Sequence, residues 1–142
     1  MRILHGVDLV SVDRIKKIIE RYGMHGLNRL WSPEEIKDII GDREEDQKAD
    51  EPLTLTPGQI ASFAARFASR EATVKALGTG FSRGISLRDI HVSRDPFGAP
   101  QLYLTGKAAE RAQELQVDSW TLSLTHEAGL ALASVVMLVR EK

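Results

Sequence analysis

The 142-residue sequence contains no cysteine, and this absence excludes several kinds of chemistry. Without thiols the chain has no disulfide scaffold, no thiolate zinc site and no cysteine nucleophile. Long apolar runs are also missing near the N-terminus, where Asp8 and Asp13 interrupt the sequence. No segment there has the pattern of a signal peptide or of a membrane span. We therefore expect a cytoplasmic protein.

An excess of either charge is missing as well, because 19 Lys and Arg residues oppose 20 Asp and Glu residues. The net charge of -1 gives no global attraction to nucleic acids or anionic membranes, so we expect neither as a partner. The 42% of hydrophobic and 27% of charged residues are typical of a soluble globular protein. The length suits one domain with its own core, and we predict a single domain over residues 1–142.

The N-terminal half of the sequence predicts a strand followed by helices. The apolar segment 3–10 predicts a buried strand, and the next segment predicts a helix that Ser11 caps and Gly23 ends. Two more helices begin at SPEE and TPGQ, where Ser32 and Thr56 precede Pro and then Glu or Gln at capping-box positions. Residues 41–57 are polar and without period, so we expect a mobile surface connection there.

The C-terminal half predicts mainly strands. Residues 89–104 predict two strands joined by a turn over 95–100, and the next segment predicts a helix capped by Thr105. Two further strands, joined by a turn near Gly129, end the chain. Strands and helices in this order predict an α+β fold.

The helix predicted over residues 59–77 carries a carboxylate on its apolar side. At about 100° per residue, Glu71 falls inside the stripe of apolar side chains formed by Ile60, Phe63, Ala64, Phe67 and Val74. A surface ion pair between Glu71 and Lys75, worth about 0.2–0.5 kcal/mol, is one explanation. Because a charge on a helix that lies against a sheet is costly unless it is paired, we expect partners for all four charged side chains of this helix: Arg66, Arg70, Glu71 and Lys75.

Asp8 presents the same problem on the first strand. It shares one face with Leu4, Gly6 and Val10, which places its carboxylate among apolar or small neighbours. Hydrogen bonds to backbone amides at a strand end are the common explanation. Two buried acids can also meet around a cation, and Mg²⁺ commonly takes one or two carboxylates together with water and substrate phosphates.

A glycine-rich loop between two basic residues follows the helix. In KALGTGFSRG, Lys75 and Arg83 flank Gly78, Thr79 and Gly80. The spacing is neither that of a P-loop nor G-x-G-x-x-G, and Gly78 alone predicts a helix C-cap. Glycines also allow a phosphate to approach the backbone closely, so the loop is a candidate phosphate site.

Four segments carry a resemblance that covers nearly the whole chain: GVDLVSVDRI, FASREATVKALGTG, FGAP and LSLTHE. In this order they are similar to segments of the holo-acyl-carrier-protein synthase family, the small bacterial 4'-phosphopantetheinyl transferases. Arg70 stands where that family usually has lysine, which keeps the charge but changes the geometry. The resemblance implies an antiparallel sheet wrapped around a long central helix, and a homotrimer with active sites between subunits.

The resemblance also implies the activity. It implies transfer of 4'-phosphopantetheine from coenzyme A to a serine of apo acyl carrier protein, with release of 3',5'-ADP, in fatty acid biosynthesis. Asp8 and Glu71 would bind Mg²⁺, Glu71 or a metal-held water would act as general base, and Lys75 would stabilise or protonate the departing phosphate. The nucleotide and pyrophosphate site would be lined by Arg66, Lys75, Gly78, Thr79, Gly80, Pro100 and His126.

A basic stripe on the first helix is a candidate docking surface for the carrier protein. Arg14, Lys17 and Arg21 recur at i, i+3 and i+7, and the resemblance implies that Arg14 grips the acidic carrier. Alternatively, this stripe is an ordinary solvated face of the helix. For His126, the alternative to a site residue is a hydrogen-bonded surface residue. Two other functions stay open, a non-catalytic metal- and nucleotide-binding regulatory domain and a purely structural interaction module.

Overall fold

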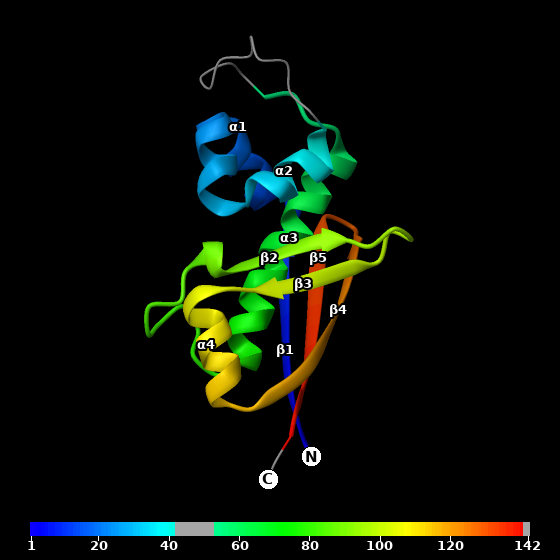
Figure 1. Ribbon diagram of the computed structural model, residues 1–142. Coiled ribbons are helices and arrows are strands. Elements are labelled where there is room, and N and C mark those ends of the chain that lie inside the picture. The colour runs from blue at the N-terminus through cyan, green and yellow to red at the C-terminus, as the bar shows by residue number, and fades with distance from the viewer. Residues whose placement is uncertain (42–52, 141–142) are drawn as a thin grey trace.

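The computed structural model describes residues 1–41 and 53–140. Figure 1 shows the long helix α3 in the middle, with strands β1, β5 and β4 alongside it and the β2–β3 pair crossing it. The described elements, in chain order, are β1 (Arg2–Ser11), α1 (Val12–Leu30), α2 (Pro33–Ile40), α3 (Pro57–Ala76), the 3₁₀ helix η1 (Leu87–Asp89), β2 (Ile90–Arg94), β3 (Pro100–Leu104), α4 (Gly106–Glu114), β4 (Val117–Glu127) and β5 (Leu130–Val139). The predicted α+β fold, an antiparallel sheet against a long central helix, is confirmed.

The larger sheet has three antiparallel strands in the order β1-β5-β4. Its register places Asp8 opposite Ala133, and Ala133 opposite Leu124 on the far strand. β2 and β3 form a separate antiparallel pair in the same part of the chain where two strands are predicted. The two edges of the larger sheet are therefore β1, with Asp8, and β4, with Leu124 and His126.

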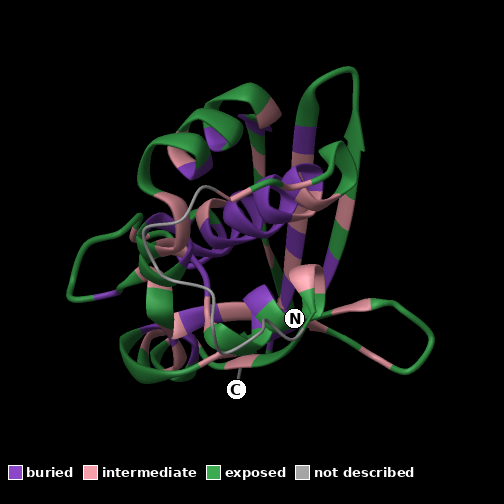
Figure 2. Ribbon diagram, turned by 90° about the horizontal axis from the view of Figure 1, so that it is seen from above, coloured by how far each residue is buried: buried purple, intermediate pink, exposed green. Residues whose placement is uncertain are grey.

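Helix α3 contributes more buried hydrophobic residues to the core than any other described element. Phe63, Ala64, Ala68 and Ala72 are fully buried, and Figure 2 shows α3 as the largest buried element. The small residues let the sheet approach closely: a Cβ atom added to Gly6 of β1 would lie 1.8 Å from the Ala72 carbonyl oxygen. Strand and helix are thus in direct backbone contact, so side chains of β1 and α3 near this point are held in fixed relative positions.

The prediction that segment 3–10 is buried is correct for one face only. Gly6 and Val10 are buried beneath α3, but Ile3, Val7 and Leu9 on the other face are 66%, 46% and 56% exposed. Within the described residues nothing covers this face of the sheet. Apolar residues on both faces of β1 led to the error, because the sequence pattern does not show what covers each face.

Local signals at helix ends are mostly confirmed. Ser32 and Thr56 form the predicted capping boxes. Gly23 breaks α1 with φ 56°, as a helix stop should, but the chain resumes helical structure and α1 extends to Leu30. Thr105 precedes α4 without a capping side-chain bond, and its hydroxyl instead contacts the Asp89 carbonyl oxygen at 3.4 Å. The predicted connection over 41–57 falls mainly on residues 42–52, outside the described residues. No helix in the described ranges is long and apolar enough to cross a membrane.

Candidate active site

Asp8 and Lys75 form the fixed part of the site. The Lys75 Nζ lies 3.1 Å from the Asp8 Oδ1 and 3.1 Å from the Val7 carbonyl oxygen, to which it donates. The Asp8 side chain is 17% exposed and the Lys75 side chain 53% exposed. Since β1 and α3 touch at Gly6, the ammonium group is anchored to the strand while its outer side stays accessible.

Glu71 lies one helical turn before Lys75 and makes no hydrogen bond or ion pair with another described side chain. Burial raises the pKa of Glu71, and the negative charge of Asp8 raises it further, while Lys75 and Arg14 lower it. The simple pair between Glu71 and Lys75 is therefore wrong, because Lys75 bonds Asp8 instead. In the described part of the chain, no group of three or more acidic or histidine side chains is placed to hold a metal.

The loop after α3 is open to solvent. Gly78 and Gly80 have φ values of 75° and 58°, and a Cβ atom at either position would meet no atom within 4 Å. The amides of Gly78, Thr79 and Gly80 bond the carbonyl oxygens of Val74 and Lys75, so the loop closes the C-terminal end of α3 as a cap. The loop thus leads away from Lys75 with free space beside its glycines.

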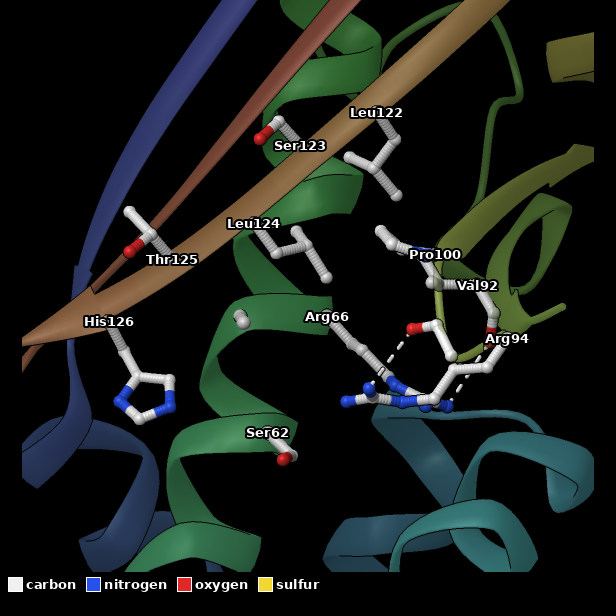
Figure 3. Close-up of a pocket in the computed structure, with 12 residues that line it drawn as sticks. Ser62, Arg66, Val92, Arg94, Pro100, Leu122, Ser123, Leu124, Thr125 and His126 are labelled. Carbon is white, nitrogen blue, oxygen red and sulfur yellow. Dashed lines mark hydrogen bonds between the residues drawn. The ribbon is translucent and has the colours of Figure 1, made fainter. Parts of the chain in front are cut away.

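A pocket of about 360 Å³ lies between α3, β4 and the β2–β3 pair. Arg66, Pro100 and His126, three of the predicted nucleotide-site residues, line it (Figure 3). Lys75 and the Gly78–Gly80 loop do not, so the structure divides the predicted set into two groups. We call this cavity the donor pocket, after the role proposed for it below. Its remaining lining residues are Ser62, Ala65, Val92, Arg94, Gly98, Leu122, Ser123, Leu124 and Thr125.

The two groups lie on opposite flanks of α3. At about 100° per residue, the mean direction of Ser62, Ala65 and Arg66 is about 150° from that of Glu71 and Lys75. The sheet register agrees, because Asp8 is on one edge strand and Leu124 is at the same level on the other. In one chain, α3 therefore separates the donor pocket from the carboxylate pair.

Arg66 and Arg70 have the charged partners that were predicted from the sequence, although the sequence did not show which residues these would be. Arg70 is 1% exposed and pairs with the fully buried Glu35 of α2, and it also donates to the Leu87 carbonyl oxygen at 3.1 Å. Arg66 is 2% exposed, pairs with Asp38 and donates to the Val92 carbonyl oxygen at 3.1 Å. Arg70 thus holds α2 against α3 and does not face the carboxylate pair. Its geometry suits this because a guanidinium binds a carboxylate through two nitrogens, as Arg70 does.

An apolar groove not predicted from the sequence leads to Glu71. It lies between α1, α3 and the segment after the glycine loop, and Arg14 and Glu71 are its charged lining residues. The apolar lining is Ile18, Leu30, Phe67, Phe81, Ile85 and Leu87. The residues of this groove come from three segments with no shared motif, so only the folded chain brings them together.

The predicted basic stripe lines a shallow depression on α1 beside this groove. Arg14, Lys17 and Arg21 surround it together with Ile18 and Tyr22. Lys17 is paired with Asp13 at 3.0 Å, which reduces its free charge. Arg14 lies over the Phe67 ring, 5.8 Å from its centre, and lines both the depression and the groove. The stripe is thus continuous with the approach to Glu71.

Comparisons with known proteins decide the family. A family model described as the 4'-phosphopantetheinyl transferase superfamily matches residues 5–133. The chain belongs to this superfamily. A holo-acyl-carrier-protein synthase of Maridesulfovibrio salexigens is 39% identical over 93% of this chain and 94% of its own length, and one of Nitratidesulfovibrio vulgaris is 42% identical over the same shares.

Solved structures agree. The holo-acyl-carrier-protein synthase of Helicobacter pylori, crystallised with coenzyme A, matches with a TM-score of 0.73 and 32% identity over 95% of this chain and all of that one. The synthase of Neisseria meningitidis matches with a TM-score of 0.74 and 28% identity over 95% of this chain and 97% of that one. The resemblance stated from the sequence, and with it the class of transferase, is confirmed.

Proposed function

We propose that this protein transfers 4'-phosphopantetheine from coenzyme A to a serine of apo acyl carrier protein, giving the holo form and 3',5'-ADP, in the cytoplasm and in support of fatty acid biosynthesis. The observation that carries the proposal is that Asp8 and Glu71 lie close enough to interact beside Lys75, while Glu71 lines an open groove and has no hydrogen bond or ion pair to any described side chain. This arrangement offers oxygen ligands, a base and a cation at one place, in a chain of the matching superfamily.

The two carboxylates fit a magnesium ion. Both are hard oxygen donors, and the negative charge of Asp8 opposes ionisation of Glu71 by raising its pKa, which a bound cation would relieve. Asp8 and Glu71 would hold the ion, with its other positions left to water and to phosphate oxygens. When bound, Mg²⁺ neutralises negative charge on the pyrophosphate of the donor.

The side chains of the protein take different roles in the reaction. The serine hydroxyl loses its proton to Glu71 as its oxygen forms a bond to the β-phosphorus of coenzyme A. The bond from that phosphorus to the bridging oxygen breaks, and the electron pair leaves with 3',5'-ADP. The Lys75 ammonium, fixed by Asp8 and the Val7 carbonyl, stabilises the growing charge on that oxygen. The open space beside Gly78 and Gly80 lets the same phosphates approach the loop.

The donor pocket would take the adenosine end of coenzyme A. Pro100, Leu122 and Leu124 offer an apolar surface for the base, and Arg66, Arg94 and His126 give the pocket positive or polar groups. Because α3 lies between this pocket and the carboxylate pair, one donor molecule cannot occupy both within one chain. The pocket of one subunit must therefore face the carboxylates of a neighbour.

The uncovered face of the β1-β5-β4 sheet is the surface that we propose joins the subunits. Ile3, Val7 and Leu9 are exposed there, and apolar groups on this scale are commonly covered in an oligomer. A cyclic homotrimer closes such contacts and gives three equivalent composite sites. Light scattering should give three times the chain mass for the wild type, and a smaller mass for Val7→Lys.

The direct test of the activity is the mass of apo acyl carrier protein after incubation with the protein, coenzyme A and Mg²⁺. We expect the carrier to gain one phosphopantetheine unit. An unchanged mass with a competent acceptor would refute the transferase and leave the non-catalytic metal- and nucleotide-binding domain as the better account.

A further inference from the structure

Of the two arginines that line the donor pocket, Arg66 is already committed to the protein. Its side chain is 2% exposed, and its guanidinium pairs with Asp38 and donates to the Val92 carbonyl oxygen at 3.1 Å. Figure 3 shows its side chain running from α3 toward β2, along the wall of the pocket. A ligand would have to break these buried bonds to bind the Arg66 charge fully, at a cost typical of buried pairs.

Arg94 is held differently. Its side chain is 49% exposed, and its Nε lies 3.8 Å from the Asp38 Oδ2. Its Nη1 donates to the Gly98 carbonyl oxygen at 3.4 Å, near the limit for a hydrogen bond. Figure 3 shows the side chain crossing from β2 toward Ser62 of α3, in the direction opposite to that of Arg66. Long, partly exposed contacts of this kind are weak, so the Arg94 guanidinium is available to an anion.

The surroundings of Arg94 favour an anion that carries an apolar ring system, because Pro100 and Leu124 line the same pocket. No acidic side chain lines the pocket, and the hydroxyls of Ser62, Ser123 and Thr125 lie on its α3 and β4 sides. Asp38 stands behind both arginines and pairs with each, so it neutralises part of their mutual repulsion.

We propose that Arg94 binds the 3'-phosphate of coenzyme A and makes the enzyme prefer coenzyme A to 3'-dephospho-coenzyme A. The inference rests on the proposed function, in which the pyrophosphate must lie at the carboxylate pair where the bond breaks. The phosphate that remains for the donor pocket is then the one on the ribose. A guanidinium suits it because two N–H groups can bond two phosphate oxygens at once.

The test compares both donors at saturating apo carrier protein. Arg94→Ala should raise KM for coenzyme A by about 10- to 100-fold, the usual range for losing a hydrogen bond to a charged group. KM for 3'-dephospho-coenzyme A should change little, and kcat should change little with either donor. Arg94→Lys should restore part of the preference, since lysine keeps the charge but not the paired geometry.

Arg140→Ala is the matched control, because Arg140 also pairs with an aspartate, Asp118, but at the opposite end of the sheet. It should leave the preference for coenzyme A unchanged. An equal loss with both donors in Arg94→Ala would overturn the proposal. If the wild type transfers nothing, the proposed function fails, and calorimetric titration with the two donors still decides on Arg94: equal affinities of wild type and Arg94→Ala for coenzyme A would refute its role.

Discussion

Glu71 is a carboxylate whose ionisation the folded chain opposes, first through burial and then through the charge of Asp8, both of which raise its pKa. The folded state therefore holds the Glu71 proton more tightly than the unfolded state, whose value is near 4.5. The free energy of unfolding therefore decreases as the pH rises from the unfolded-state pKa of Glu71 through its folded-state pKa. Above the folded-state pKa, the full destabilisation by the ionised Glu71 carboxylate is present.

Glu71→Gln should therefore make the metal-free protein more stable than the wild type at neutral pH. The variant keeps the side-chain volume and removes the charge, as often happens when an active-site group is neutralised. The difference in Tm, measured with a chelator present over a pH series, should vanish once the pH is below the ordinary glutamate range. Glu34→Gln, at an exposed position of α2, should show no such gain. A Glu71→Gln protein less stable than wild type at neutral pH would contradict this account.

The same variant should lose metal binding and activity. Added Mg²⁺ should raise the Tm of the wild type by binding the folded state, and should leave that of Glu71→Gln nearly unchanged. Transfer should fall by orders of magnitude, because both a metal ligand and the base are removed. Near-normal turnover in Glu71→Gln would exclude both roles.

At the scale of elements, α2 is held to α3 by a buried ion pair. Glu35 is fully buried, accepts from Arg70 and also from the Val92 amide at 3.2 Å. Glu35→Ala should destabilise the protein by about 3–5 kcal/mol, since it leaves the Arg70 charge buried and unpaired. Urea unfolding measures this. The double variant Glu35→Leu, Arg70→Met replaces both charges with apolar side chains and should recover most of the lost stability. A small effect of Glu35→Ala alone would contradict the prediction and show that water reaches Arg70.

Local signals explain what the sequence predicted at this scale. Ser32 and Thr56 predict the starts of their helices because a capping box needs only two residues three positions apart in the sequence. Asp8 and Glu71 could be predicted as candidate site residues because each carboxylate interrupts an apolar pattern. The partners of Arg66 and Arg70 could not be predicted, since Asp38 and Glu35 are 28 and 35 residues away in the sequence and nothing in the sequence links either pair. Arg94 belongs to no motif, and an arginine at the end of a strand carries no sequence signal that predicts a function.

Helix α1 is the element that we expect to dock the carrier protein. Because Arg14 lines both the basic depression and the groove to Glu71, an acidic partner bound there would have its serine near the base. The double variant Arg14→Glu, Arg21→Glu should raise KM for the carrier protein and flatten its salt dependence, while KM for coenzyme A changes little. Lys17→Glu should have less effect, since Asp13 already pairs with Lys17. Wild-type efficiency of the double variant at low salt would place the docking surface elsewhere.

For the whole molecule, the central claim is that the donor pocket and the carboxylate pair act together only across subunits. Two facts support it: α3 separates the two groups within a chain, and one face of the sheet presents uncovered apolar residues. Ser62→Trp would fill the donor pocket from α3, and Glu71→Gln removes the charge of the carboxylate site. Each variant alone should be inactive.

The most direct measurement is the mass of apo acyl carrier protein after incubation with coenzyme A, Mg²⁺ and a co-expressed mixture of these two variants. In a randomly mixed trimer, about a quarter of the sites combine an intact pocket from one subunit with intact carboxylates from its neighbour. The account predicts that this mixture adds phosphopantetheine to the carrier at up to that fraction of the wild-type rate. If the mixed trimers form and are as inactive as each variant alone, while the wild type modifies the carrier, the site is complete within one chain and the account is wrong.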